Sequence, residues 1–224
     1  MKKYFSLLIC ALVSALAFNV NVSAKTTMTT LPQAVEEEIG YFGDSANFKD
    51  ESTFQAYQEY VNKLKAADLS SYQENSNKVN VYIFRGSSCW HCLDEITWLA
   101  ENYKEYSQYI NVHTYEVWGN KENNKLMSSV ANLLGKKVSG VPFTVVGKDT
   151  FSGFGENTGS QIIEKAKQLY SSNEKYDIKD YIDLEENTLK DVEKKSSNTL
   201  MVVLIIAVLV IGGAVIVYLI SKSK

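Results

Sequence analysis

Cysteine, proline and histidine are scarce in this chain of 224 residues, which has three, two and two of them respectively. Cys10 lies inside an apolar run near the N-terminus, so Cys89 and Cys92 are the only cysteines in the rest of the chain. A small secreted domain that depends on disulfides for stability would have several widely spaced cysteines. Because these two cysteines form one C-x-x-C, the sequence excludes such a framework and assigns the pair to chemistry.

An excess of positive charge is also missing. The chain has 23 Lys and Arg and 26 Asp and Glu, which gives a net charge of −3. Removing Lys2, Lys3, Lys222 and Lys224, at the chain ends, from the 23 bases leaves 19 against 26 acids, so residues 25–199 carry −7. Proteins that bind nucleic acid normally have a basic face. The sequence therefore predicts no nucleic-acid partner.

Residues 1–24 have the layout of a secretory signal peptide. Lysines come first, an apolar run follows, and Val22-Ser23-Ala24 has the small-x-small pattern that signal peptidase cleaves. The alternative is a first membrane helix that is not cleaved. Cys10 follows Ile9, where a lipoprotein site would have a small residue, so we expect Cys10 to be removed with the signal and not lipidated.

Residues 200–220 contain no charged side chain. A helix rises about 1.5 Å per residue, so this segment would span roughly 30 Å, the thickness of a bilayer core. Lys222 and Lys224 favour the cytoplasmic side, which makes 221–224 a cytoplasmic tail. The sequence thus predicts one transmembrane helix in the cell membrane, with residues 25–199 outside the cell. A buried core helix is the alternative.

The residues between these ends have the pattern of an α/β domain. We expect an N-terminal helical extension at 25–74, a domain at 75–170 and a charged, solvated stalk at 171–199, with residues 26–30 in a loose segment. Within the domain, β-rich and amphipathic runs alternate. They predict strands at 79–84, 111–118, 141–146 and 150–154, and helices at 90–106, 121–134 and 160–170. This order indicates a mixed sheet flanked by helices.

Cys89-Trp90-His91-Cys92 follows the first strand and begins a helix. Unpaired N–H groups and the positive end of the helix dipole would stabilise a Cys89 thiolate there. Cys89 is thus the predicted nucleophile and Cys92 the cysteine that resolves a mixed disulfide. His91 would add positive charge beside the thiolate. A stabilised thiolate is a good leaving group, which favours disulfide formation or isomerisation over reduction.

Other interpretations of these residues are less consistent with the sequence. A zinc site needs about four ligands, and only His91 and His113 could join the two cysteines, so no metal is predicted. An inert structural disulfide is disfavoured because C-x-x-C rings have poor geometry for one. Trp90 is either a substrate-contacting ring or a cap on the helix. Arg85 is interpreted as a solvated charge at a strand end, in preference to a group that stabilises the thiolate.

The dithiol together with Val141-Pro142, at the entry of a later strand, resembles the thioredoxin superfamily over residues 75–170. The resemblance implies a thioredoxin-like mixed sheet, a cis-proline at Pro142 beside the dithiol, and backbone groups of Val141 that bind substrate as a strand would. The alternative is that Pro142 only begins a strand.

The chain departs from the family pattern at two positions. Many members have a buried acid six residues before the first cysteine, where this chain has Ile83, and Asp94 and Glu95 are the candidate replacements. Trp90 also occupies a place that is usually small. These departures put the route of proton transfer in doubt.

These interpretations predict an extracytoplasmic thiol–disulfide oxidoreductase that needs no cofactor. Its partners would be cysteine-containing secreted or surface proteins, the bilayer and a membrane redox protein. Cys89 and Cys92 would react, Trp90 and His91 would support them, and Val141 and Pro142 would bind substrate. The alternatives are a membrane-anchored reductase of the same fold and a non-catalytic surface binding module.

Overall fold

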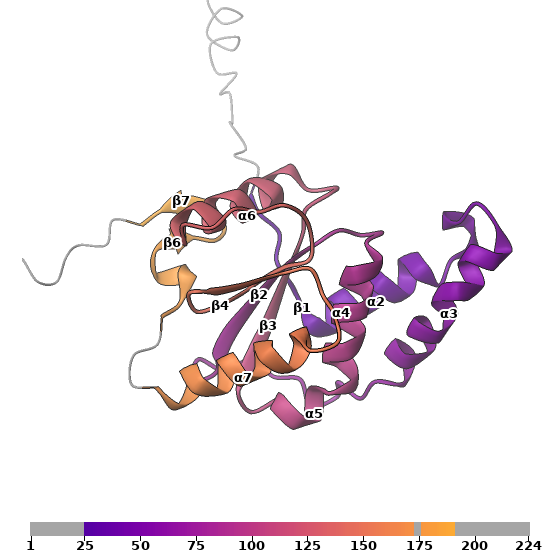
Figure 1. Ribbon diagram of the computed structural model, residues 1–224, viewed down its shortest axis with the longest axis horizontal. Coiled ribbons are helices and arrows are strands. Elements are labelled where there is room, and N and C mark those ends of the chain that lie inside the picture. The colour runs from indigo at the N-terminus through magenta and orange to yellow at the C-terminus, as the bar shows by residue number, and fades with distance from the viewer. Residues whose placement is uncertain (1–24, 173–175, 191–224) are drawn as a thin grey trace, which may run out of the picture. The chain divides into compact units, whose positions relative to one another are not determined.

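The computed structural model describes residues 25–172 and 176–190 (Figure 1). The predicted signal peptide at 1–24, the predicted span at 200–220 and the tail at 221–224 lie outside these ranges. Within them, no helix has both the length and the apolar character needed to cross a membrane. The expectation of a fold that includes a transmembrane helix is therefore corrected: the described fold is an α/β domain without one.

A five-stranded mixed sheet forms the centre of the described structure, with the strand order β1-β3-β2-β4-β5. β2 and β3 are parallel, and every other pair of neighbours in this sheet is antiparallel. The strands are β1 (Thr29–Thr30), β2 (Val79–Arg85), β3 (Ile110–Glu116), β4 (Phe143–Val146) and β5 (Asp149–Ser152). The predicted mixed sheet is thus confirmed.

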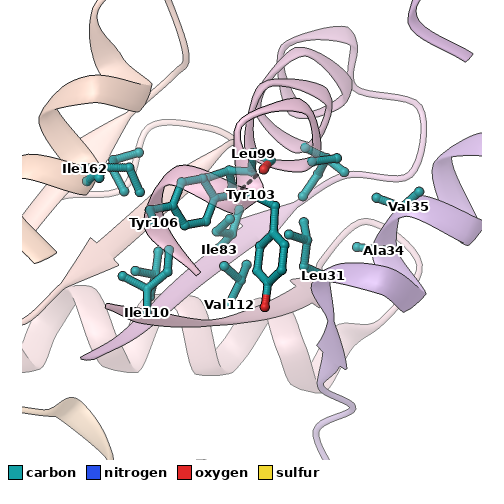
Figure 2. Packing of buried hydrophobic residues seen from close by; sticks show 14 of the residues in the cluster. Leu31, Ala34, Val35, Ile83, Leu99, Tyr103, Tyr106, Ile110, Val112 and Ile162 are labelled. Atoms are coloured by element: carbon teal, nitrogen blue, oxygen red, sulfur yellow. Dashed lines mark hydrogen bonds between the residues drawn. The ribbon is translucent and has the colours of Figure 1, made fainter. Parts of the chain in front are cut away.

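Successive side chains of a strand point to opposite sides of the sheet. Because the strands carry apolar side chains on both sides, helices cover both faces. On β2, Val81 and Ile83 enter one apolar cluster, and Tyr82 and Phe84 enter the other. Five helices contribute residues to the first cluster, part of which Figure 2 shows. They are α2 (Leu31–Phe42), α3 (Glu51–Ala66), α4 (Trp90–Glu101), α5 (Tyr103–Tyr106) and α7 (Thr158–Ser171). The second cluster is covered by α6 (Lys121–Leu133).

The N-terminal extension is helical, as predicted, but it is also part of the sheet. β1 pairs antiparallel with β3, with Thr29 opposite Thr114, where the sequence indicated a loose segment. Two residues are too few to produce an alternating pattern, so this strand depends on the partner that β3 offers. α2 and α3 are separated by a short 3-10 helix, η1 (Ser45–Asn47), and contribute Phe42 and Leu64 to the core.

Residues 176–190 do not form the solvated stalk that their composition indicates. They contain a 3-10 helix, η2 (Ile178–Asp180), and a small hairpin of β6 (Ile182–Asp183) and β7 (Thr188–Leu189). Ile178 and Ile182 are buried in the second cluster. The carboxylate of Asp177 accepts hydrogen bonds from the side chains of Asn80 and Tyr82, each at 2.6 Å. Two apolar anchors and one carboxylate thus hold this acidic segment against the sheet.

Candidate active site

Three chain segments meet at one edge of the sheet. Arg85 at the end of β2 is paired with Glu116 at the end of the parallel strand β3. β4 runs in the opposite direction, so Phe143 at its start is paired with Phe84 at this same edge. The dithiol follows β2, and Val141-Pro142 precedes β4. The topology therefore brings together two motifs that are about fifty residues apart in the sequence.

The Val141–Pro142 peptide bond is cis, and the Cys89 Sγ lies 3.7 Å from the carbonyl oxygen of Val141. The two motifs on which the family resemblance depends are thus in contact. Val141 is partly exposed beside the sulfur, whereas Pro142 is buried. A chain that reacts at Cys89 would pass directly beside the Val141 backbone.

Cys89 and Cys92 are unlinked thiols in different environments. Cys89 is the N-cap residue of α4, and its Sγ accepts a hydrogen bond from the backbone N–H of Cys92 at 3.3 Å. Cys89 is nearly buried, with 7% of the residue exposed, whereas Cys92 is completely buried. Of the two thiols, Cys89 is therefore the one that another molecule can reach more easily.

The two thiols also differ in acidity. The hydrogen bond from the Cys92 thiol is the largest cause that lowers the pKa of Cys89, to about 7, and backbone N–H groups of Cys92 and His91 add to it against the effect of burial. Burial raises the pKa of Cys92 well above its ordinary value, although the Gly86 N–H lies 3.5 Å from its sulfur. At neutral pH the pair is therefore one partly ionised nucleophile and one protonated thiol.

Trp90 and His91 lie between the cysteines in the sequence, and the centroids of their rings are 4.0 Å apart. Trp90 is 46% exposed. His91 acts on the Cys89 sulfur through its backbone N–H, and its buried Nδ1 makes no hydrogen bond to the described residues. That the imidazole itself stabilises the thiolate stays a prediction.

Glu95 is a fully buried carboxyl, three residues after Cys92 on α4. Its Oε1 accepts a hydrogen bond from Thr144 at 2.7 Å, and its Oε2 has no hydrogen-bond partner among the described residues. Burial raises the pKa of Glu95 to about 8. Asp94 and Glu95 were the two candidates to replace the buried acid that this chain lacks at position 83. Glu95 is buried and Asp94 is only partly buried.

Arg85 is 1% exposed, so its interpretation as a solvated charge is wrong. Its Nη1 donates to Glu38 at 2.9 Å, its Nη2 donates to Glu37, and its Nε donates to Thr114 at 3.2 Å. A buried guanidinium needs such partners. α2 supplies the two carboxylates. In the sequence, the acidic run at 36–38 in an amphipathic helix was the available signal that a buried cation has a partner there.

Trp118 is a residue that the sequence did not single out, because it was placed in a strand that in fact ends at Glu116. The Glu116 carboxylate accepts from the backbone N–H groups of Ser87 (3.2 Å), Trp118 (2.8 Å) and Gly119 (2.8 Å). The Trp118 ring lies against Gly86, where a Cβ atom would come within 2.3 Å of it. Glu116 thus joins the loop after β3 to the segment that leads into the dithiol.

The second histidine lies in a different cluster. His113 on β3 is hydrogen-bonded through Nε2 to Asn80 at 2.9 Å and stacks on Tyr82. In residues 25–172 and 176–190, no group of three His, Cys, Asp or Glu side chains could hold a metal ion.

Comparisons of this chain with models of known protein families, with curated proteins and with solved structures gave no match. The class of the protein therefore depends on the described fold alone. It is a mixed α/β domain with helices on both faces of its sheet, and it is compatible with a thioredoxin-like fold.

Proposed function

We propose that this chain is a thiol–disulfide oxidoreductase of the thioredoxin superfamily that forms or isomerises disulfides in secreted or surface proteins. The observation that carries the proposal is the asymmetric dithiol: Cys89, at the start of α4, is the more exposed and more acidic thiol, and Cys92 is completely buried and protonated. An inert disulfide would not need this difference, whereas an exchange reaction does.

Disulfide formation starts from the Cys89–Cys92 disulfide. A substrate thiolate attacks the Cys89 sulfur, the bond between the two cysteines breaks, and Cys92 leaves as a thiolate that takes up a proton. A second substrate thiolate then attacks the substrate sulfur of the mixed disulfide and expels Cys89. The substrate loses two electrons and the dithiol gains them, so a partner disulfide must reoxidise the dithiol for another cycle.

The residues around the dithiol have distinct parts in this scheme. The lowered pKa of Cys89 makes its thiolate the better leaving group in the second step. Val141 offers its backbone to the substrate beside the reacting sulfur. We assign the proton exchange with the Cys92 thiolate to Glu95, which is buried three residues after Cys92 on α4 and whose charge acts on the Cys92 thiol.

A trapping experiment with the full chain tests the proposal. Cys92→Ser leaves Cys89 able to form a mixed disulfide that no internal thiol resolves, so adducts that reducing agent removes should accumulate in cells that secrete natural substrates. The matched control is Cys89→Ser, which retains the buried thiol and should give no adducts. If Cys92→Ser also gave none, the protein would not be an exchange enzyme.

The reduction potential of the dithiol tests the direction of the reaction. A value of about −120 to −180 mV fits disulfide formation or isomerisation, and a value near −270 mV fits a reductase. The lowered Cys89 pKa favours the first range, because a stabilised thiolate stabilises the reduced form.

A further inference from the structure

Trp90 and Trp118 are exposed apolar side chains close to the dithiol: Trp90 directly follows Cys89, and the Trp118 ring lies on Gly86, three residues before Cys89. We propose that they bind an aromatic or long aliphatic side chain next to the reacting cysteine of an extended, neutral or basic substrate segment. This inference rests on the proposed function, because the substrate must reach Cys89.

The exposure of both rings is unusual for this chain. Trp118 is 56% exposed and Trp90 is 46% exposed, whereas Trp98, on the same helix as Trp90, is partly buried against the core. Tryptophan is enriched among the residues that contribute most to binding, because it offers a large apolar area with little conformational entropy to lose. The two exposed indoles lie at the sheet edge that carries the dithiol.

Trp118 is held in place and does not extend freely into solvent. Glu116 binds the backbone N–H groups of Trp118 and Ser87, and the indole lies on Gly86. The Gly86 carbonyl in turn accepts the N–H of Cys89 at 3.1 Å. The ring is therefore fixed relative to the reactive sulfur before a substrate arrives, which reduces the entropy lost on binding.

Trp90 is the second exposed indole, and it follows Cys89 in the sequence, whereas Trp118 lies on Gly86, which precedes Cys89. Trp90 is the first residue of α4, directly after Cys89, and its ring packs on His91. Of its two predicted roles, substrate contact and helix cap, the exposure favours substrate contact. The cap position itself is occupied by Cys89, whose sulfur accepts the N–H of Cys92.

The accessible part of Cys89 is small, and this restricts what can bind. The Val141 carbonyl lies 3.7 Å from this sulfur, so a thiol that attacks Cys89 comes beside the Val141 backbone. An extended segment fits such a small opening better than a cysteine inside a folded domain and can place its neighbouring side chains on the indoles.

The charged side chains near the dithiol determine which extended segments fit. Glu116 reaches Ser87, and Asp94 follows Cys92 by two residues. These carboxylates repel acidic segments and attract basic ones, and they act mainly on the rate of association. Charge complementarity therefore identifies the bound segment as neutral or basic.

The test measures how fast thiol peptides reduce the Cys89–Cys92 disulfide of the full chain. The first peptide has tryptophan beside its cysteine and a lysine nearby. The second replaces that tryptophan by serine, and the third replaces the lysine by glutamate. We expect the first to react about three to ten times faster than the second, the range that an aromatic pair contributes beyond burial, and faster than the third.

Variants show whether the two indoles cause this preference. Trp118→Ala should bring the ratio of the first two rates well below that of the parent chain, because only Trp90 remains, and Trp118→Phe should restore most of it. The matched control is Tyr170→Ala, which removes an exposed ring that packs on Tyr109, just before the start of β3 and thus at the opposite edge of the sheet. This control should leave the ratio unchanged.

The possible failures are distinguishable. If the disulfide reacts with glutathione but treats the tryptophan and serine peptides equally, or reacts faster with the glutamate peptide, the binding surface is refuted and the oxidoreductase stands. The same holds if Trp118→Ala retains the full preference. If neither glutathione nor any peptide reduces the disulfide, the proposed function itself fails.

Discussion

Replacing Cys92 by alanine should raise the pKa of Cys89 by about one unit or more. The hydrogen bond from the Cys92 thiol is the largest of the causes that lower this pKa from about 9 to about 7. Alanine removes that donor, but it keeps the backbone N–H of residue 92, which lies 3.3 Å from the Cys89 sulfur. The pKa should therefore rise without reaching its ordinary value.

Serine at the same position gives the matched comparison. Its hydroxyl can donate to the Cys89 thiolate as the thiol does, so Cys92→Ser should keep the pKa of Cys89 near 7. Both variants lack the second sulfur and neither can form the internal disulfide. A difference between them therefore reports the side-chain hydrogen bond alone.

The assay must follow the full pH profile, because a rate at one pH would conceal the effect. A rise of one unit lowers the thiolate fraction at pH 7 from about one half to about one tenth, but each thiolate becomes about threefold more nucleophilic. The rate of alkylation at pH 7 would fall only about twofold. The alkylation of Cys89 is followed between pH 5 and pH 10 on the proteolytic fragment that contains this residue. The midpoint of the rate profile gives the pKa of Cys89 and separates the variants. A midpoint that stays near 7 in Cys92→Ala would refute the reasoning.

Two further predictions concern buried side chains near the dithiol. Because burial raises the pKa of Glu95 to about 8 from 4.5, folding becomes less favourable as the pH rises between these values. Glu95→Gln should thus be more stable to urea than the parent chain at pH 8, by on the order of 4 kcal/mol, and equal to it below pH 4; a difference that does not depend on pH would contradict this. Burial raises the pKa of Glu38 to about 9, so Arg85→Ala leaves a protonated buried carboxyl without its donor and should cost about 1–3 kcal/mol in urea unfolding at pH 7. An unchanged free energy of unfolding would contradict this.

The sequence predicted the strands and helices of the domain well where several residues repeat a pattern. β2 and β3 have long β-rich runs, and α6 has a clear amphipathic period, so local preference and burial agree there. Short elements escaped prediction. β1 has two residues, and the hairpin at 182–189 has two strands of two residues each, so their pairing depends on partners that are distant in sequence.

Charged side chains were the other source of error. Arg85 and Asp177 belong to types that are usually solvated, and composition alone places them outside. Both are instead held by hydrogen bonds to residues from other elements, Arg85 to α2 and Asp177 to β2. A sequence does not show such partners, because they come together only when the chain folds.

By itself, the sequence determined the dithiol and its position at the start of a helix, because these follow from local spacing and from the chemistry of cysteine, whereas its pairing with a later Val-Pro was implied by the family resemblance. Only the tertiary structure decided how the two thiols differ. The complete burial of Cys92 and the slight exposure of Cys89 depend on how α4 packs on the sheet. The packing of α4 on the sheet likewise decided that Glu95 lies inside, where it accepts from Thr144 of β4, and the β2–β3 register decided that Trp118 lies on Gly86, because it aligns the ends of these strands at one edge.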